Sequence, residues 1–166
     1  LAVEHGADEV DIVLALNAFL AGDYDSAAEE IRQVRECIDA VAARQGRKVH
    51  LKVILETGLL RTSEAIANAS FLAMEAGADF IKTSTGKVDV NATPAAAYIM
   101  CECIARFHEM TGKKIGFKPA GGISSAADAL CYYSIVSTVL GTEWLNKELF
   151  RFGVSRVANS ILSGVE

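Results

Sequence analysis

The sequence lacks the features that mark membrane, nucleic-acid-binding and metal-binding proteins. No apolar run approaches the ~20 residues of a membrane-spanning helix. The 16 lysines and arginines are scattered and outnumbered by 21 acidic residues, so we expect no nucleic-acid partner. Neither the three histidines nor the four cysteines have metal-ligand spacing, and we expect no metal, no cofactor, no disulfide and a cytoplasmic location. The cysteines are Cys37, Cys101, Cys103 and Cys131.

What the sequence does contain is a regular alternation of apolar and amphipathic segments. Apolar residues recur at helical spacing between the apolar runs, with helix starts expected at Ser63, Thr93, Ser124 or Ser125, and Ser155. Buried strands separated by such helices predict a parallel sheet covered by helices. We interpret residues 1–166 as a single α/β domain of about six βα units. The expected strands lie at 9–14, 49–55, 80–82, 115–118, 136–140 and 149–152.

Two arrangements of such units fit the pattern. One is a doubly wound sheet, and the other is a TIM (β/α)8 barrel, which needs two more units and ordinarily more than about 200 residues. Residues 1–6 resemble the last turns of a helix that ends at Gly6, and the chain does not begin with Met. We therefore expect that these residues follow a missing N-terminal part, which could supply the first two units.

Two lysines at the ends of predicted strands are the most informative feature. Lys82 and Lys118 each follow an apolar run, at the sheet edge that holds the active site in α/β proteins. Burial and a neighbouring cation would lower the pKa of Lys82, and Lys118 is the expected cation. A neutral amine held in this way attacks carbonyl groups to form a Schiff base. The alternative is that both lysines only neutralise carboxylates at the sheet edge.

Asp11 and Lys52 are charged residues within predicted strands. Asp11 interrupts the apolar run 10–13, and Lys52 interrupts the run 51–54. Alternation along a strand allows both side chains to point to the interior. Asp11 could move protons in an imine pathway, or the two residues could simply form a buried ion pair.

Glycine-bearing segments follow three of the predicted strands and indicate a phosphate site. Glycines allow backbone N–H groups to approach an anion closely, and a helix N-terminus adds partial positive charge. Each segment is a weak signal by itself, but together with Lys87 they favour a phosphorylated substrate. The candidate phosphate-binding residues are Gly86, Lys87, Gly121, Gly122 and Ser155.

Six motifs lie at residues 8–13, 51–58, 80–87, 91–93, 116–123 and 151–153. Together they resemble the deoxyribose-phosphate aldolase family over essentially the whole chain. The resemblance implies a (β/α)8 barrel and a metal-free class I lyase that cleaves 2-deoxy-D-ribose 5-phosphate into glyceraldehyde 3-phosphate and acetaldehyde. It further implies that Lys82 forms the Schiff base, Lys118 depresses its pKa and Asp11 relays protons. Lys52 matches a further active-site lysine, and the glycine segments match the family's phosphate site.

The chain also departs from the family pattern. Two N-terminal βα units are absent, and Arg156 stands where a second serine is expected. Two other functions therefore stay open: a non-catalytic phosphate-binding fragment, and a Schiff-base aldolase for another phosphosugar. We expect small phosphorylated sugars and acetaldehyde as partners, without nucleic acid or membrane. Because family members are often dimers, a homodimer is one expected assembly.

Overall fold

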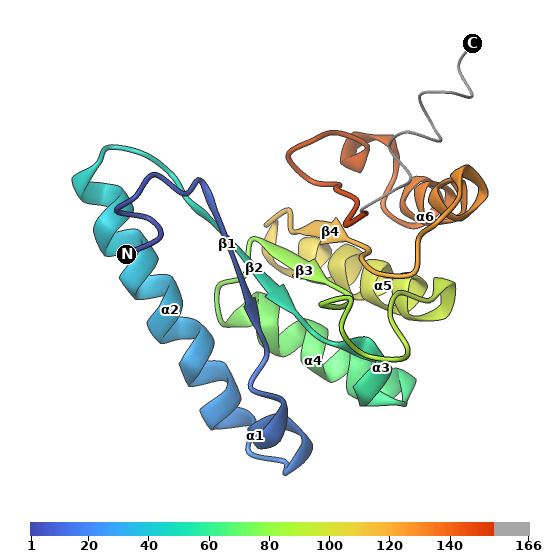
Figure 1. Cartoon of the computed structure of the whole chain (residues 1–166), viewed down its shortest axis with the longest axis horizontal. Coiled ribbons are helices and arrows are strands. Elements are labelled where there is room, and N and C mark those ends of the chain that lie inside the picture. The colour runs from blue at the N-terminus through green and yellow to red at the C-terminus, as the bar shows by residue number, and fades with distance from the viewer. Residues whose placement is uncertain (155–166) are drawn as a thin grey trace.

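A four-stranded parallel sheet forms the centre of the protein in a computed structural model, which describes residues 1–154 (Figure 1). The strands lie in sequence order, β1-β2-β3-β4, and each neighbouring pair is parallel. No helix among residues 1–154 is long and apolar enough to cross a membrane. The elements are β1 (Glu9–Val13), α1 (Leu16–Leu20), α2 (Tyr24–Arg44), β2 (His50–Ile54), α3 (Thr57–Leu60), α4 (Ser63–Glu75), β3 (Phe80–Lys82), α5 (Pro94–Thr111), β4 (Gly116–Lys118), α6 (Ala126–Val139) and the 3₁₀ helix η1 (Thr142–Trp144).

The strand order decides between the two arrangements that the sequence allows. In a doubly wound sheet the strand order reverses at a switch point and helices cover both faces. Here the order does not reverse, and helices α2, α4, α5 and α6 pack in succession, each against the next. This is the arrangement of a barrel wall, and the described residues form an open part of a (β/α)8 barrel.

Alternation along the strands separates an apolar outer face from a polar inner face. Leu51 and Val53 are fully buried in the main hydrophobic core. Lys52, which lies between them in β2, points to the opposite face, where Asp11 is its register partner on β1. Lys82 and Lys118 are register partners on β3 and β4. The polar inner face therefore carries the charged side chains that the sequence places within strands.

Side-chain caps begin the three helices α4, α5 and α6. The hydroxyl of Thr62 accepts a hydrogen bond from the amide of Ala65, so the predicted cap at Ser63 is wrong by one residue. Thr93 caps α5 ahead of a first-turn proline, as predicted. Of the two serines proposed for α6, Ser125 is the cap, and with Asp128 it forms a capping box.

Two of the six predicted strands differ in the structure. The segment 136–140 is not a strand, because α6 continues through Val139 and buries Ala129, Tyr132 and Val136 at helical spacing. The segment 149–152 does not form a regular strand among the described residues, although Phe150 bridges to Phe117 and Gly153 bridges to Ala120. The terminal helix expected from Ser155 lies outside the described residues.

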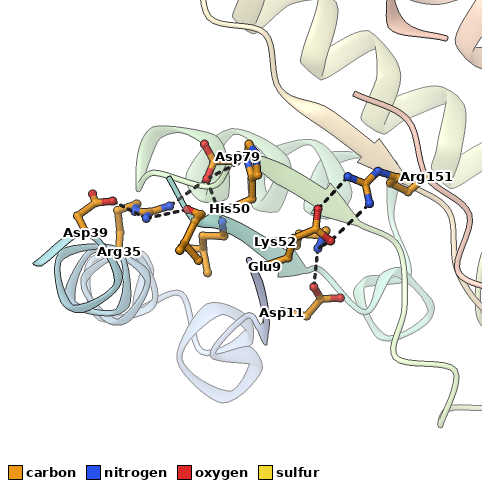
Figure 2. Close-up of polar contacts among 10 residues, drawn as sticks. Glu9, Asp11, Arg35, Asp39, His50, Lys52, Asp79 and Arg151 are labelled. Carbon is orange, nitrogen blue, oxygen red and sulfur yellow. Dashed lines mark hydrogen bonds and ion pairs between the residues drawn. The ribbon is translucent and has the colours of Figure 1, made fainter. Parts of the chain in front are cut away.

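A polar cluster ties α2 to the amino-terminal ends of β2 and β3 (Figure 2). The guanidinium of Arg35 donates to a carboxylate oxygen of Asp79 at 2.9 Å and to the carbonyl of Val49 at 3.1 Å. The same oxygen of Asp79 accepts from the amide of Leu51 at 2.9 Å. Because these contacts join a helix to two strands, we assign this cluster a structural role.

Candidate active site

Three lysines converge on the carboxylate of Asp11 at the inner face of the sheet. Lys52 donates to Oδ1 of Asp11 at 3.1 Å. Lys82 and Lys118 donate to Oδ2 at 3.0 and 3.3 Å. The three lysines come from the three strands that follow β1, and Lys118 lies 107 positions from Asp11 in the sequence. The structure thus brings together the four residues that the sequence proposes as catalytic.

The three lysine side chains differ in their exposure to solvent, and this decides which of them a substrate can reach. The side chain of Lys52 is 2% exposed, whereas those of Lys82 and Lys118 are 13% and 19% exposed. Lys52 is therefore closed off from solvent, and only Lys82 and Lys118 of the three can meet a molecule that enters from solvent.

A second carboxylate, which the sequence interpretation missed, belongs to the same cluster. Glu9 lies two residues before Asp11 on the same face of β1, and its Oε2 accepts from Lys52 at 2.7 Å (Figure 2). Its Oε1 accepts from the guanidinium of Arg151 at 2.9 Å. The spacing of Glu9 and Asp11 could have indicated a shared face, but the contact with Arg151 joins residues 142 positions apart.

The cations determine the ionisation of the carboxylates. Burial opposes ionisation of Asp11, but hydrogen bonds from Lys82 and Lys52 and the charge of Lys118 lower its pKa to about 2. Burial likewise opposes ionisation of Glu9, while the hydrogen bond and charge of Lys52 and the charge of Arg151 lower its pKa. Both carboxylates are therefore ionised at neutral pH.

The pKa of Lys118 is lowered from its ordinary value. Burial of the ammonium group is the largest cause, and the charges of Lys82 and Lys52 act in the same direction. The charge of Asp11 and its hydrogen bond oppose this shift. Within residues 1–154, four cations gather around two carboxylates, and this excess of positive charge favours loss of the Lys118 proton.

The loops that follow β3 and β4 contain glycines in the left-handed region. Gly86 and Gly122 have φ angles of 84° and 77°, and the space where a Cβ would lie is open at both. Gly121 differs, because a Cβ there would lie 2.7 Å from the side chain of Asn91 and its amide already donates to the carbonyl of Gly153. Lys87 is exposed in the same loop as Gly86. Ser155, the remaining candidate, lies outside the described residues.

Two buried side chains hold these loops in place, and neither was singled out from the sequence. The Thr83 hydroxyl, fully buried, accepts from the amide of Ala120 at 2.9 Å and donates to its carbonyl at 3.1 Å. Glu56, at a φ of 53°, accepts from the amide and the hydroxyl of Thr85. These contacts connect the loops after β2, β3 and β4, which surround the lysines.

The fold and the lysine cluster define an α/β-barrel protein. Its candidate active site is a cluster of lysine side chains at the carboxyl edge of the sheet. No group of three or more potential metal ligands occurs in the part of the chain that the structure describes. The chain belongs to the DeoC/LacD aldolase family, whose sequence profile matches residues 1–131.

Curated relatives agree with this assignment. The chain is 48% identical over 161 residues to deoxyribose-phosphate aldolase of Homo sapiens, an alignment that covers 97% of this chain and 48% of the human protein. Deoxyribose-phosphate aldolase of Mus musculus is 45% identical over 166 residues, which cover 100% of this chain and 48% of that protein. The chain thus spans about half the length of the curated relatives it matches.

Solved aldolase structures share the fold. The aldolase QR15 superposes with a TM-score of 0.70 at 29% identity, over 98% of this chain and 62% of that one. Deoxyribose phosphate aldolase from Aeropyrum pernix, described as having a unique tetrameric structure, gives a TM-score of 0.71 at 21% identity. That superposition covers 99% of this chain and 58% of the other, and it concerns the fold alone.

Proposed function

We propose that the protein cleaves 2-deoxy-D-ribose 5-phosphate reversibly into D-glyceraldehyde 3-phosphate and acetaldehyde, with Lys82 as the Schiff-base nucleophile. The convergence of Lys82 and Lys118 on one oxygen of Asp11, at 3.0 and 3.3 Å, is the observation that carries this proposal. Membership of the DeoC/LacD aldolase family, and relatives named deoxyribose-phosphate aldolase, support the choice of substrate.

The reaction begins when the unprotonated amine of Lys82 attacks the aldehyde carbon of the open-chain sugar. A carbon–nitrogen bond forms, and the carbinolamine loses water to give a protonated imine. The hydroxyl on the third carbon then gives up its proton, and the bond between the second and third carbons breaks. Its electron pair flows into the imine, D-glyceraldehyde 3-phosphate leaves, and an enamine remains on Lys82. Protonation of the enamine and hydrolysis of the imine release acetaldehyde and restore the amine.

The neighbours of Lys82 take the remaining roles. Lys118 takes the role that the family resemblance implies, a second lysine beside the nucleophile, and it shares Oδ2 of Asp11 with Lys82. Asp11, ionised and within hydrogen-bond distance of both amines, accepts and returns protons during carbinolamine dehydration and its reversal. Lys52, being buried, holds Asp11 through Oδ1 and does not meet substrate.

The phosphate of the substrate would bind at the loops after β3 and β4. Gly86 and Gly122 carry no side chain that would block the approach of an anion to their own backbone N–H groups, and Lys87 adds positive charge. Gly121 supports the loop through its hydrogen bond to Gly153 rather than through a free amide. We include Ser155 in this phosphate site on the basis of the family motif alone.

Reductive trapping tests the proposal directly. The full-length protein is incubated with acetaldehyde and borohydride, and the modified lysine is located by peptide mass spectrometry. We expect an ethyl adduct on Lys82, its loss in Lys82→Arg, and its retention in the control Lys113→Arg, which changes an exposed lysine. An adduct mainly on Lys118, whose pKa burial lowers, would reverse the two roles. No adduct on either lysine would refute a Schiff-base mechanism here.

The assembly and the location of the protein are part of the same proposal. We propose a self-associating enzyme, and light scattering of the full-length protein measures its mass in solution. We also propose a cytoplasmic enzyme, since all four cysteines are free thiols and two of them, Cys101 and Cys103, are buried. Cell fractionation tests this location.

A further inference from the structure

Glu9 links the two edges of the sheet across the polar inner face. It lies on β1, the first strand of the sheet, and its partner Arg151 lies in the bridged segment that follows β4, the last strand. The guanidinium contacts both carboxylate oxygens of Glu9, at 2.9 and 3.5 Å (Figure 2). Such two-point contact fixes the direction of the carboxylate as well as its position.

Glu9 and Asp11 both contact the same buried lysine. The ammonium of Lys52 is closed off from water and contacts two carboxylates, Glu9 at 2.7 Å and Asp11 at 3.1 Å. A buried ammonium needs compensating charge, because an unpaired buried ion is strongly destabilising. Without Glu9, Lys52 would compete with Lys82 and Lys118 for the oxygens of Asp11. With Glu9 in place, Oδ2 of Asp11 stays with Lys82 and Lys118.

We propose that Glu9, held by Arg151, is a positioning residue of this site that neutralises Lys52 and thereby reserves one oxygen of Asp11 for Lys82 and Lys118. The inference rests on the proposed Schiff-base function. Glu9 acts through Lys52 and Asp11 and does not contact substrate. Neither Glu9 nor Arg151 takes part in the bond-making steps of the proposed mechanism. Their substitution should therefore change the pH dependence and the rate of imine formation at Lys82.

This role predicts opposite shifts for the two members of the pair. Glu9→Gln removes a negative charge near the amines, so protonated lysine becomes less favourable and imine formation moves to lower pH, by roughly half a unit. Arg151→Gln removes a positive charge and moves it to higher pH by a similar amount. The double variant restores the net charge, so its pH midpoint should return close to that of the parent. It still lacks Glu9, however, so Lys52 competes for Asp11 and the rate of adduct formation should stay below that of the parent.

The experiment measures the initial rate of ethyl adduct formation on Lys82 across a pH series. The parent is compared with Glu9→Gln, Arg151→Gln, the double variant and Arg151→Lys, each checked for native circular dichroism. Arg151→Lys keeps the charge and should keep the pH midpoint, although the loss of the two-point contact lowers the rate. Glu29→Gln, which removes the same charge from an exposed pair with Arg32, is the matched control and should leave the profile unchanged.

The outcomes separate this inference from the proposed function. If the parent forms the adduct but Glu9→Gln and Glu29→Gln have the same pH profile, the positioning role of Glu9 is overturned. The proposed Schiff-base function would then still stand. The positioning role would also be overturned if Arg151→Lys shifted the pH midpoint as far as Arg151→Gln does. The comparison of these two variants tests the role even if Glu9→Gln does not fold. If the parent forms no adduct with acetaldehyde, the proposed function fails. Reductive methylation of Lys82 and Lys118 by formaldehyde and borohydride then tests whether the variants shift in the same order.

Discussion

Replacing Asp11 by asparagine tests the electrostatic centre of the site. Asparagine keeps the shape of the side chain and one carbonyl acceptor but removes the charge that three ammonium groups share. We expect the substitution to lower the free energy of unfolding at neutral pH. Imine formation should also slow by about 100-fold or more, because a positioned proton-transfer group is lost.

The pKa of Asp11 sets the size and the pH range of the stability effect. A fall from 3.8 to about 2 corresponds to about 2 kcal/mol of favourable interaction. The side chain keeps 28% of its exposure, so screening by solvent reduces this contribution to about 1 kcal/mol. Because the pKa is depressed in the folded protein, the stabilisation is present above the unfolded value of 3.8 and is lost as the pH falls through about 2.

Urea unfolding followed by circular dichroism, from neutral pH down to about pH 2, checks this expectation. Parent and Asp11→Asn should differ by about 1 kcal/mol at neutral pH. The difference should shrink below about pH 4, because the carboxylate becomes protonated first in the unfolded chain and only near pH 2 in the folded protein. Asp89→Asn, a change at an exposed loop position, is the matched control and should show no such pH dependence. A difference that stays constant down to about pH 2 would refute the assignment of Asp11 as a carboxylate stabilised by the lysines.

Three further predictions concern single positions. Lys118→Leu removes the cation that shares Oδ2 of Asp11 and should move the pH profile of imine trapping upward by roughly one unit; an unchanged profile would exclude its electrostatic role. Gly116→Ala places a Cβ 2.2 Å from the ring of Phe80, so we expect the free energy of unfolding in urea to fall by about 1 to 3 kcal/mol. An unchanged free energy of unfolding would show that the ring moves aside freely. Thr83→Val keeps the side-chain volume but leaves the amide and carbonyl of Ala120 without their partner, which should cost about 1 to 3 kcal/mol and raise the KM for the phosphorylated sugar. Equal KM values for Thr83→Val and the parent would show that the loop keeps its shape without this contact.

The local elements could be predicted from the sequence because their signals are local. Strand β3 agrees with the prediction residue for residue, and the first-turn proline with its threonine cap marks the start of α5. The segment 136–140 was assigned wrongly because its β-branched residues also suit a strand. Only the capping box at Ser125 and the burial of every third or fourth side chain identify it as part of a helix. Apolar runs of this length do not distinguish the two states by themselves.

The sequence by itself determined that lysines end two strands of a parallel sheet, that a carboxylate and a third lysine lie within two other strands, and that glycine-bearing loops follow. These are statements about spacing along one segment at a time, and alternation along a strand is enough to make them. Only the tertiary structure decided that all three lysines share Asp11, because that depends on the parallel register of four strands. The partnership of Glu9 with Arg151 depends further on the curvature that brings opposite edges of the sheet together. Such contacts between distant residues follow from packing, and no short stretch of sequence contains them.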